Sequence, residues 1–455
     1  MKLYADSILI GNQWQNNVTL DIDQVGIIQS ITQGKSDDAT LAQGVVLPGM
    51  VNCHSHGFQR AFAGFSEYRA NPSDSFWSWR DIMYRFVSKM TPDDVKAVGE
   101  FVYLEMLKAG YTSVAEFHYL HHQPNGKRYA NSAEMSHQML AAAESTGIAI
   151  TLLPVLYTYA GFGEQKPSPA QARFIHQTDE YCQLVEKLFK TTQSQATQQV
   201  GIAPHSLRAV SHEQLMQITQ HIRQLDSKAP IHIHIAEQMQ EVNDSLSYYQ
   251  QRPVDWLLDH LAVDQSWCLV HATHLSSQEV EKLVQSQAVA GICATTEANL
   301  GDGVFPAEAF LQQSGRFAIG SDSHIAVNIA AELRTFEYSQ RLTHQRRAVL
   351  ASDECISIGQ NLFAHAAREG ASTVNQNVGE IAVGKRADLI VIDPSHPSLF
   401  AKKESQILDA AIFACAQLPI KSVMVAGQWQ VEQGKHRAEA QIIERYQQVL
   451  MRLAN

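Results

Sequence analysis

The chain has 455 residues, of which 45% are hydrophobic and 18% are charged, and its formal net charge is −11. That much apolar sequence can bury a large core, but no stretch reaches the roughly 18 consecutive apolar residues that a membrane span needs. An acidic surface also disfavours nucleic acids, which attract proteins through basic patches. We therefore expect a globular protein that binds neither nucleic acid nor membrane.

The six cysteines are scattered along the chain, without any pair in a CxxC spacing. Scattered cysteines are typical of reduced thiols in a cytoplasmic protein. The first residues agree, because Asp6 lies where a secretory signal peptide needs an apolar run. The sequence thus predicts a cytoplasmic location.

Short strands are the first predicted elements. Residues 1–46 contain LYADSILIG and VTLDIDQVGIIQSI, and similar stretches return at 379–435 as GEIAVGKRADLIVID and KSVMVAGQW. We expect these two ends of the chain to pair into one small β-sandwich domain. The tail, 436–455, predicts an amphipathic C-terminal helix.

Apolar or β-branched runs alternate with helical patterns between the two ends, at residues 47–378. One helix is predicted at 91–110, with Thr91 as N-cap, Pro92 at its first position and Gly110 as its stop. Eight runs end in polar, chemically capable residues: 50–56, 112–119, 149–157, 199–206, 231–237, 267–274, 289–299 and 317–324. Eight strand–helix units predict a (β/α)8 barrel of the α/β class, in which a functional site lies at the C-terminal ends of the strands.

Three histidines and one aspartate lie at such strand ends. His54 and His56 are two residues apart, so their rings point the same way from an extended segment, while His234 and Asp322 end the fifth and eighth runs. Each alone is more often a packed core residue or a helix cap. Together they predict a site for one metal ion, zinc by preference and iron as second choice. His232 shares the face of His234, but it lies farther from the mouth, so we expect it to be a hydrogen-bonded core residue.

Several motifs resemble the amidohydrolase superfamily over nearly the whole chain. They are LPGMVNCHSH, the HIAE sequence, the Ser-Asp pair at strand eight and the closing GEIAVGKRADLIVID. Two-metal members usually carry a modified lysine at the end of strand four, where this chain has Ala203-Pro204-His205. The spacing of His234 and Glu237 instead resembles the branch that deaminates C–N bonds with one metal. The resemblance implies that Glu237 shuttles protons, that His271 holds the attacking water and that Asp322 acts as base.

These residue types suit the hydrolysis of an amidine-like carbon. The reaction needs a nucleophilic water, a proton for the leaving nitrogen and stabilisation of a tetrahedral intermediate. A bound metal lowers the pKa of water towards ~7. Glu237 can protonate the imino nitrogen, Asp322 can take the proton of the water, and His271 can fix the nucleophile.

Further polar residues follow strands one, two and four. On an acidic protein, arginines at the barrel mouth can each hold a carboxylate in a bidentate fork. The stretches HSHGFQRAFAG, FWSWRDIMYRF, EFHYLHH, APHSLRAV and HIHIAEQ resemble a branch of the superfamily that acts on linear amidines. This resemblance implies a homodimer that converts N-formimidoyl-L-glutamate and water to N-formyl-L-glutamate and ammonia in histidine degradation. It also implies a set of residues around the substrate carboxylates: Gln59, Arg80, Tyr119, His205 and Arg208.

Two other functions stay open. A one-metal aminohydrolase could act on a purine, pterin or triazine ring, with Phe76, Trp77 and Trp79 in an aromatic pocket, although a neutral ring would leave two arginines without partners. A non-catalytic barrel could use the metal for structure or sensing alone. Structural zinc sites are usually closed and rich in cysteine, and this ligand set contains no cysteine.

Overall fold

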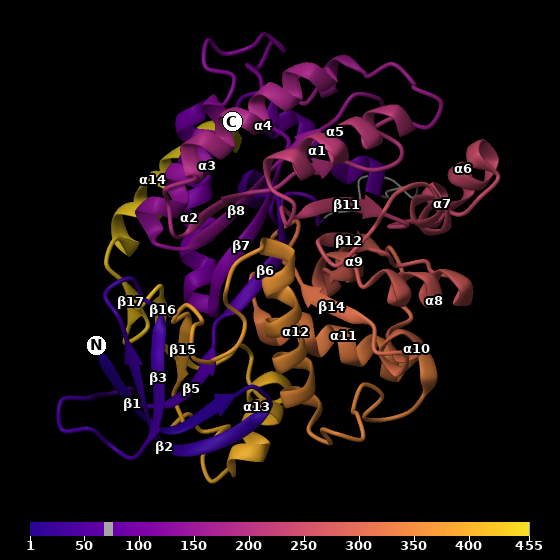
Figure 1. Cartoon of the computed structure of the whole chain (residues 1–455). Helices are drawn as coiled ribbons and strands as arrows, with labels where there is room; N and C mark the ends of the chain where they lie inside the picture. Colours follow the sequence, from indigo (N-terminus) through magenta and orange to yellow (C-terminus); the bar gives the residue numbers. More distant parts are fainter. Residues whose placement is uncertain (68–75, 455) are drawn as a thin grey trace.

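The computed structural model describes residues 1–67 and 76–454, without the side chains of 76–80. It confirms the predicted α/β class, since parallel strands alternate with helices between residues 50 and 374 (Figure 1). Among the described helices, none is both long and apolar enough to cross a membrane.

Strands from the two ends of the chain share one sheet. The N-terminal part supplies β1 (Lys2–Ile10), β2 (Gln13–Ile22), β3 (Ile28–Gln33), β4 (Thr40–Leu41) and β5 (Val45–Pro48). The C-terminal part supplies β15 (Leu389–Ile392), β16 (Ile420–Val425), β17 (Gln428–Glu432) and β18 (Lys435–His436). The order is β18-β17-β16-β15-β5-β1-β2-β3, with β4 on β1. The two groups meet where β15 pairs antiparallel with β5, so that Val391 lies opposite Val46.

The middle of the chain forms two parallel sheets. One has the order β10-β8-β7-β6, with β9 on β8, and contains β6 (Met50–Ser55), β7 (Tyr111–His118), β8 (Ala149–Leu156), β9 (Gln198–Val200) and β10 (Ala203–Pro204). The other has the order β11-β12-β13-β14 and contains β11 (Ile231–Ile235), β12 (Trp267–His271), β13 (Val289–Ile292) and β14 (Arg316–Ile319). These strands are almost continuously buried, as expected where helices cover parallel sheets.

The two parallel sheets contact each other at both edges. Ser55 forms a parallel bridge to Asp322 on one side, and Ser206 forms one to His234 on the other. The backbone N–H of Asp322 donates to the carbonyl of His54 at 3.0 Å, and the N–H of His56 donates to the carbonyl of Asp322 at 3.2 Å. The ends of β6 and β14 are therefore held in register beside each other.

Helices follow the strands and cover the sheets. The predicted helix at 91–110 is α2 (Pro92–Ala109), in which Thr91 and Asp94 form a capping box and Gly110 ends the helix at φ 98°. The other helices before residue 300 are α1 (Phe76–Val87), α3 (Glu134–Thr146), α4 (Thr178–Thr192), α5 (His212–Leu225), α6 (Met239–Tyr249), α7 (Pro253–His260), α8 (Ser277–Ser286) and α9 (Ala294–Leu300). Those after it are α10 (Ala307–Gln312), α11 (Ile329–His344), α12 (Ile358–Val374), α13 (Glu404–Phe413) and α14 (Glu439–Ala454), and the short 3-10 helices are η1 (Gly57–Phe62) and η2 (Pro169–Gln171).

Three boundaries differ from the sequence prediction. The strand predicted at 289–299 ends at Ile292, because the carboxylate of Glu297 accepts the N–H of Cys293 at 2.9 Å and starts α9. Residues 76–80 begin α1, although the sequence predicts no helix between the first strand run and residue 91. The C-terminal helix begins at Glu439 rather than 436, because Lys435 and His436 still pair with β17.

We expect Gly320→Ala to test the contact between β14 and β6. A methyl group on Gly320 would lie 2.9 Å from the Cβ, N and O atoms of His54. Overpacking of this kind costs about 1–3 kcal/mol, so the free energy of unfolding in urea should fall by that amount. The control is Gly161→Ala, whose new methyl group meets only the flexible end of Gln165. Equal stability of the two variants would contradict this account of the strand contact.

Candidate metal centre and active site

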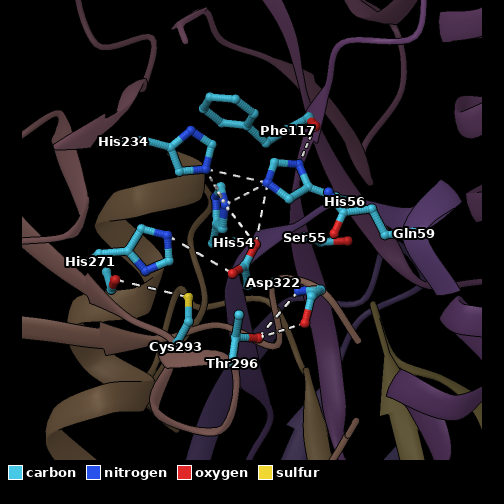
Figure 2. Close-up of polar contacts among 12 residues, drawn as sticks. His54, Ser55, His56, Gln59, Phe117, His234, His271, Cys293, Thr296 and Asp322 are labelled. Carbon is cyan, nitrogen blue, oxygen red and sulfur yellow. Dashed lines mark hydrogen bonds and ion pairs between the residues drawn. The ribbon is translucent and has the colours of Figure 1, made fainter. Parts of the chain in front are cut away.

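Four side chains converge where β6, β11 and β14 end. His54 and His56 come from β6, His234 from β11, and Asp322 from the turn after β14. Their ligand atoms all lie within 4.8 Å of one another, and all four residues are buried. Figure 2 shows the three rings directed towards one another and towards the carboxylate of Asp322.

The distances between these atoms suit a shared cation. The Nε2 atoms of His54, His56 and His234 lie 3.0–3.3 Å apart, and Oδ1 of Asp322 lies 3.4 Å from His54 and 3.3 Å from His56. Two nitrogens bound to one zinc ion at about 2.0–2.1 Å lie roughly 3.0–3.4 Å apart at near-tetrahedral angles. The residues present therefore fit a metal ion without rearrangement.

For two of the three rings, those of His56 and His234, a hydrogen bond on the far side fixes the tautomer. Nδ1 of His56 donates to the carbonyl of Phe117 at 2.9 Å, and Nδ1 of His234 donates to the carbonyl of His205 at 3.1 Å. In a neutral imidazole the other nitrogen then carries only a lone pair. Two such lone pairs face each other at 3.3 Å. That arrangement is repulsive unless a cation lies between them, as in metal sites whose histidines are oriented by carbonyls.

The charges of the cluster point the same way. Burial and then His56 lower the pKa of His54 to about 3, and burial also lowers the pKa of His56 and His234. Burial opposes ionisation of Asp322, but the hydrogen bond and charge of His54 hold the pKa of this carboxyl well below its ordinary value. Neutral imidazoles and an ionised carboxylate are the protonation states in which these groups bind a metal.

A second acid–base group lies beside the cluster. Nε2 of His271 is 3.8 Å from Glu237 and 3.9 Å from Asp322, and its Nδ1 is 3.2 Å from Glu297. Burial disfavours the charged imidazole, yet Glu237 and the hydrogen bond to Glu297 raise the pKa of His271 to about 10. Burial raises the pKa of Glu237, against the opposing charges of His271 and Arg208. Glu237 is thus suited to carry and release a proton.

Glu297 was not found from the sequence. It orients His271, but it lies in a run that the sequence predicts as strand, so nothing placed it at a strand end. Glu297 lies in the first turn of α9, and an acidic residue at the start of a helix was the one feature of the sequence that could have indicated it. His232, in contrast, bonds the carbonyl of Thr373 at 2.7 Å and is fully buried, which confirms that it is a core residue.

A cavity of about 630 Å³, its mouth included, lies over the cluster. Four of the predicted substrate-binding residues line it together with the acid–base residues: Gln59, Tyr119, His205 and Arg208. The side chain of Arg80 lies outside the described residues. Aromatic and aliphatic side chains complete the wall: Met83, Tyr84, Tyr157, Phe174 and Leu300. The pocket thus combines convergent polar groups with an aromatic and aliphatic wall, as is typical of small-molecule sites.

The polar lining residues are held in different ways. Gln59 is 2% exposed, and its amide donates to the hydroxyl of Tyr119 at 2.8 Å. Its Oε1 atom has no hydrogen-bond partner among the described residues. Arg208 lies 3.7 Å from Glu237 and 3.7 Å from Glu241. The guanidinium is therefore beside the acid–base group rather than at a distant rim.

The backbone at these strand ends is unusual. Ala236, His271 and Asp322 have φ values of 51°, 69° and 45°. Residues other than glycine adopt such left-handed conformations at a cost of order 1–3 kcal/mol, and functional sites are where they concentrate. The sharp turn at each strand end directs Glu237, His271 and Asp322 towards one cavity.

Comparison with known proteins agrees with this geometry. The profile described as the amidohydrolase family matches residues 45–430. The chain belongs to the amidohydrolase family. It is 44% identical to a formimidoylglutamate deiminase of Pseudomonas aeruginosa over 98% of both chains.

Two solved structures resemble the whole chain. One is an amidohydrolase from Brucella melitensis, with a TM-score of 0.94, 42% identity and complete coverage of both chains. The other is an adenosine deaminase from Xanthomonas campestris with bound zinc, with a TM-score of 0.80 and 20% identity, covering 100% of this chain and 98% of that one. The second likeness shows the fold alone.

Metal content can test the cluster directly. We expect His234→Ala to lose most of the bound metal, because it removes one of the converging nitrogens. The matched control is His232→Ala, two residues earlier on the same strand, which removes a core hydrogen bond and should keep its metal. Metal binding by the two variants can be measured by elemental analysis and by the rise in Tm on adding metal. Equal metal content in the two variants would show that the cluster is not the metal site.

Proposed function

We propose that this amidohydrolase hydrolyses N-formimidoyl-L-glutamate to N-formyl-L-glutamate and ammonia, and so acts on the C–N bond of a linear amidine. The likeness to a formimidoylglutamate deiminase at 44% identity over 98% of the chain supports this. The observation that carries the proposal is that the guanidinium of Arg208 lines the same cavity as Glu237 and the cluster of candidate metal ligands. An anionic group held by Arg208 can leave an amidine carbon beside the cluster.

We assign the metal ligands to His54, His56, His234 and Asp322. Zinc, one ion per chain, is the metal we propose, with iron as second choice, because nitrogen and oxygen ligands of this kind suit zinc and the similar Xanthomonas campestris structure carries it. When bound, the ion supplies the Lewis acidity that makes water a nucleophile near neutral pH.

The chain's own groups then move the protons. Asp322 takes the proton of the attacking water, while His271, fixed by Glu297 at 3.2 Å, holds that water against the amidine carbon. Glu237 donates a proton to the leaving nitrogen, so that the C–N bond breaks and ammonia departs. Water thus supplies the formyl oxygen, and the remaining nitrogen stays on glutamate.

We propose that the substrate carboxylates are held by Gln59, Arg80, Tyr119, His205 and Arg208. Arg208 provides a charged fork of the kind that matches a carboxylate. Gln59 adds an amide whose donor is oriented by Tyr119. The apolar wall around them limits the access of bulk solvent, so that the attacking water is the one that His271 holds.

Deamination of a purine, pterin or triazine ring is the second candidate. Tyr84, Tyr157 and Phe174 line the cavity and offer flat apolar surface to a ring. A neutral ring, however, has no anionic group for the guanidinium of Arg208 to hold, whereas the carboxylates of formimidoylglutamate match its fork. Formimidoylglutamate therefore fits the cavity better.

The finer architecture is also a proposal. We propose that β6 to β14 form one closed (β/α)8 barrel over 47–378, in which β9 and β10 are two parts of one strand because both pair with β8. We also propose that 1–46 and 379–435 form a β-sandwich domain, with a C-terminal helix in 436–455. Backbone bridges at both edges of the two parallel sheets support the barrel. A core separate from the main one supports the sandwich, since it joins Leu3, Leu20 and Val46 to Leu389 and Met424. A homodimer in the cytoplasm remains the expectation for the assembly.

The function can be tested by ammonia release. Purified protein of measured metal content should release one ammonia per N-formimidoyl-L-glutamate, and Glu237→Gln should bind metal normally yet lose activity by about 10²–10⁴-fold. Guanine and adenosine serve as comparison substrates in the same assay. Turnover of a ring without turnover of formimidoylglutamate would reject the proposal.

Arg208→Met tests the carboxylate contact. The loss of a charged hydrogen bond costs about 1.5–3 kcal/mol, so KM for formimidoylglutamate should rise by roughly 10- to 100-fold while metal content is unchanged. Arg208→Lys keeps the charge but not the fork, so its KM should lie between those of the unmodified enzyme and Arg208→Met. An unchanged KM in Arg208→Met would show that the carboxylates bind elsewhere.

A further inference from the structure

Glu241 is a buried carboxylate that the proposed reaction does not use. It lies in the first turn of α6, four residues after Glu237, and only 4% of its surface is exposed. A buried carboxylate is costly unless hydrogen bonds or charges compensate it. Its partners therefore indicate what it does.

Two of these partners are consecutive backbone N–H groups at the end of β11. The N–H of Ala236 donates to Oε1 of Glu241 at 3.2 Å, and the N–H of Glu237 donates to Oε2 at 3.4 Å. Both N–H groups can face one carboxylate because Ala236 turns the chain with φ 51°. Successive N–H groups in such a turn form a concave anion site. Glu241 thus holds the turn that carries Glu237.

The third partner is the guanidinium of Arg208. Its Nε atom lies 3.7 Å from Glu241, and its Nη2 atom lies 3.7 Å from Glu237. Burial opposes the charge of Arg208, but Glu241 first and then Glu237 raise its pKa. Arg208 is therefore shared between a carboxylate behind it and a carboxylate in the cavity. Without Glu241, its nearest remaining carboxylate would be Glu237.

We propose that Glu241 is a positioning residue with two roles: it holds the backbone at Glu237, and it attracts the Nε side of the Arg208 guanidinium away from the Glu237 carboxylate. The guanidinium of Arg208 then remains available to bind a carboxylate of an acidic substrate. The inference rests on the proposed function, because it requires a substrate carboxylate on Arg208. It adds to that function a physical link between substrate recognition and proton transfer. One side chain keeps the two groups from neutralising each other.

Glu241→Gln separates this role from simple support of the fold. Glutamine keeps one carbonyl oxygen as acceptor for one of the two backbone N–H groups, replaces the other acceptor by an NH2 donor, and removes the charge that balances Arg208. KM for N-formimidoyl-L-glutamate should rise roughly tenfold, with a smaller fall in kcat and unchanged metal content. In an Arg208→Met background the same change should leave KM unaltered, because the group through which Glu241 acts is gone.

The matched control is Asp244→Asn. Asp244 lies on the same helix and lines a small outer cavity together with Arg208 and Glu241, but its carboxylate forms no ion pair with Arg208 among the described residues, and its charge raises the pKa of Arg208 less than those of Glu241 and Glu237 do. Removing this nearby charge should leave KM within about twofold.

The outcomes distinguish the two proposals. If the unmodified enzyme turns over formimidoylglutamate but Glu241→Gln matches Asp244→Asn, the inference is overturned and the function stands. An equal rise in KM with and without Arg208 would also overturn it, because Glu241 would then act through the fold alone. If the unmodified enzyme releases no ammonia, the function fails and takes the inference with it.

Discussion

The site depends on one electrostatic constraint: imidazole nitrogens from two separate strands must face each other at about 3 Å. Left to themselves, the lone pairs of His56 and His234 would separate, since the tautomers set by Phe117 and His205 leave no proton between them. The backbone prevents this separation. His205 accepts from both the backbone N–H of His234 at 3.1 Å and its ring, so the fourth and fifth strand ends hold that ring in place.

Backbone hydrogen bonds also hold the cluster where β6 lies beside β14, at the other edge of the two parallel sheets. Asp322 exchanges backbone hydrogen bonds with His54 and His56, and Gly320 lies against His54 because no larger residue fits there. The strands that shape the fold are thus the ones that hold the cluster. Separating these strand ends would therefore break backbone hydrogen bonds and move apart the residues of the cluster. This explains why the left-handed backbone at Ala236, His271 and Asp322 is tolerated: packing on both sides over-determines it.

The sequence was most informative where chemistry and periodicity agree. Parallel strands, the helix at 91–110 and the convergence of His54, His56, His234 and Asp322 could be predicted because each strand end carries a polar residue after an apolar run. Contacts between distant loops could not. Nothing in the spacing indicates that Glu297 reaches His271 across 26 residues or that Glu241 reaches Arg208 across 33, because such contacts depend on how α6 and α9 leave their strands.

Charge explains why these missed residues matter. The chain carries a net charge of −11, and two of its carboxylates, Glu237 and Asp322, line the cavity, so an anionic substrate approaches against the field of the protein. A cation in the cavity can reverse that field locally only while it stays available. Arg208 lies within 3.7 Å of two carboxylates, either of which could occupy it. Two backbone N–H groups anchor Glu241, so Arg208 is attracted by Glu241 on one side and by Glu237 on the other. A substrate carboxylate can bind Arg208 by displacing one of these two contacts, which are both 3.7 Å long. At Arg208, recognition of an acidic substrate by an acidic protein therefore depends on the balance between the two carboxylates that flank the guanidinium.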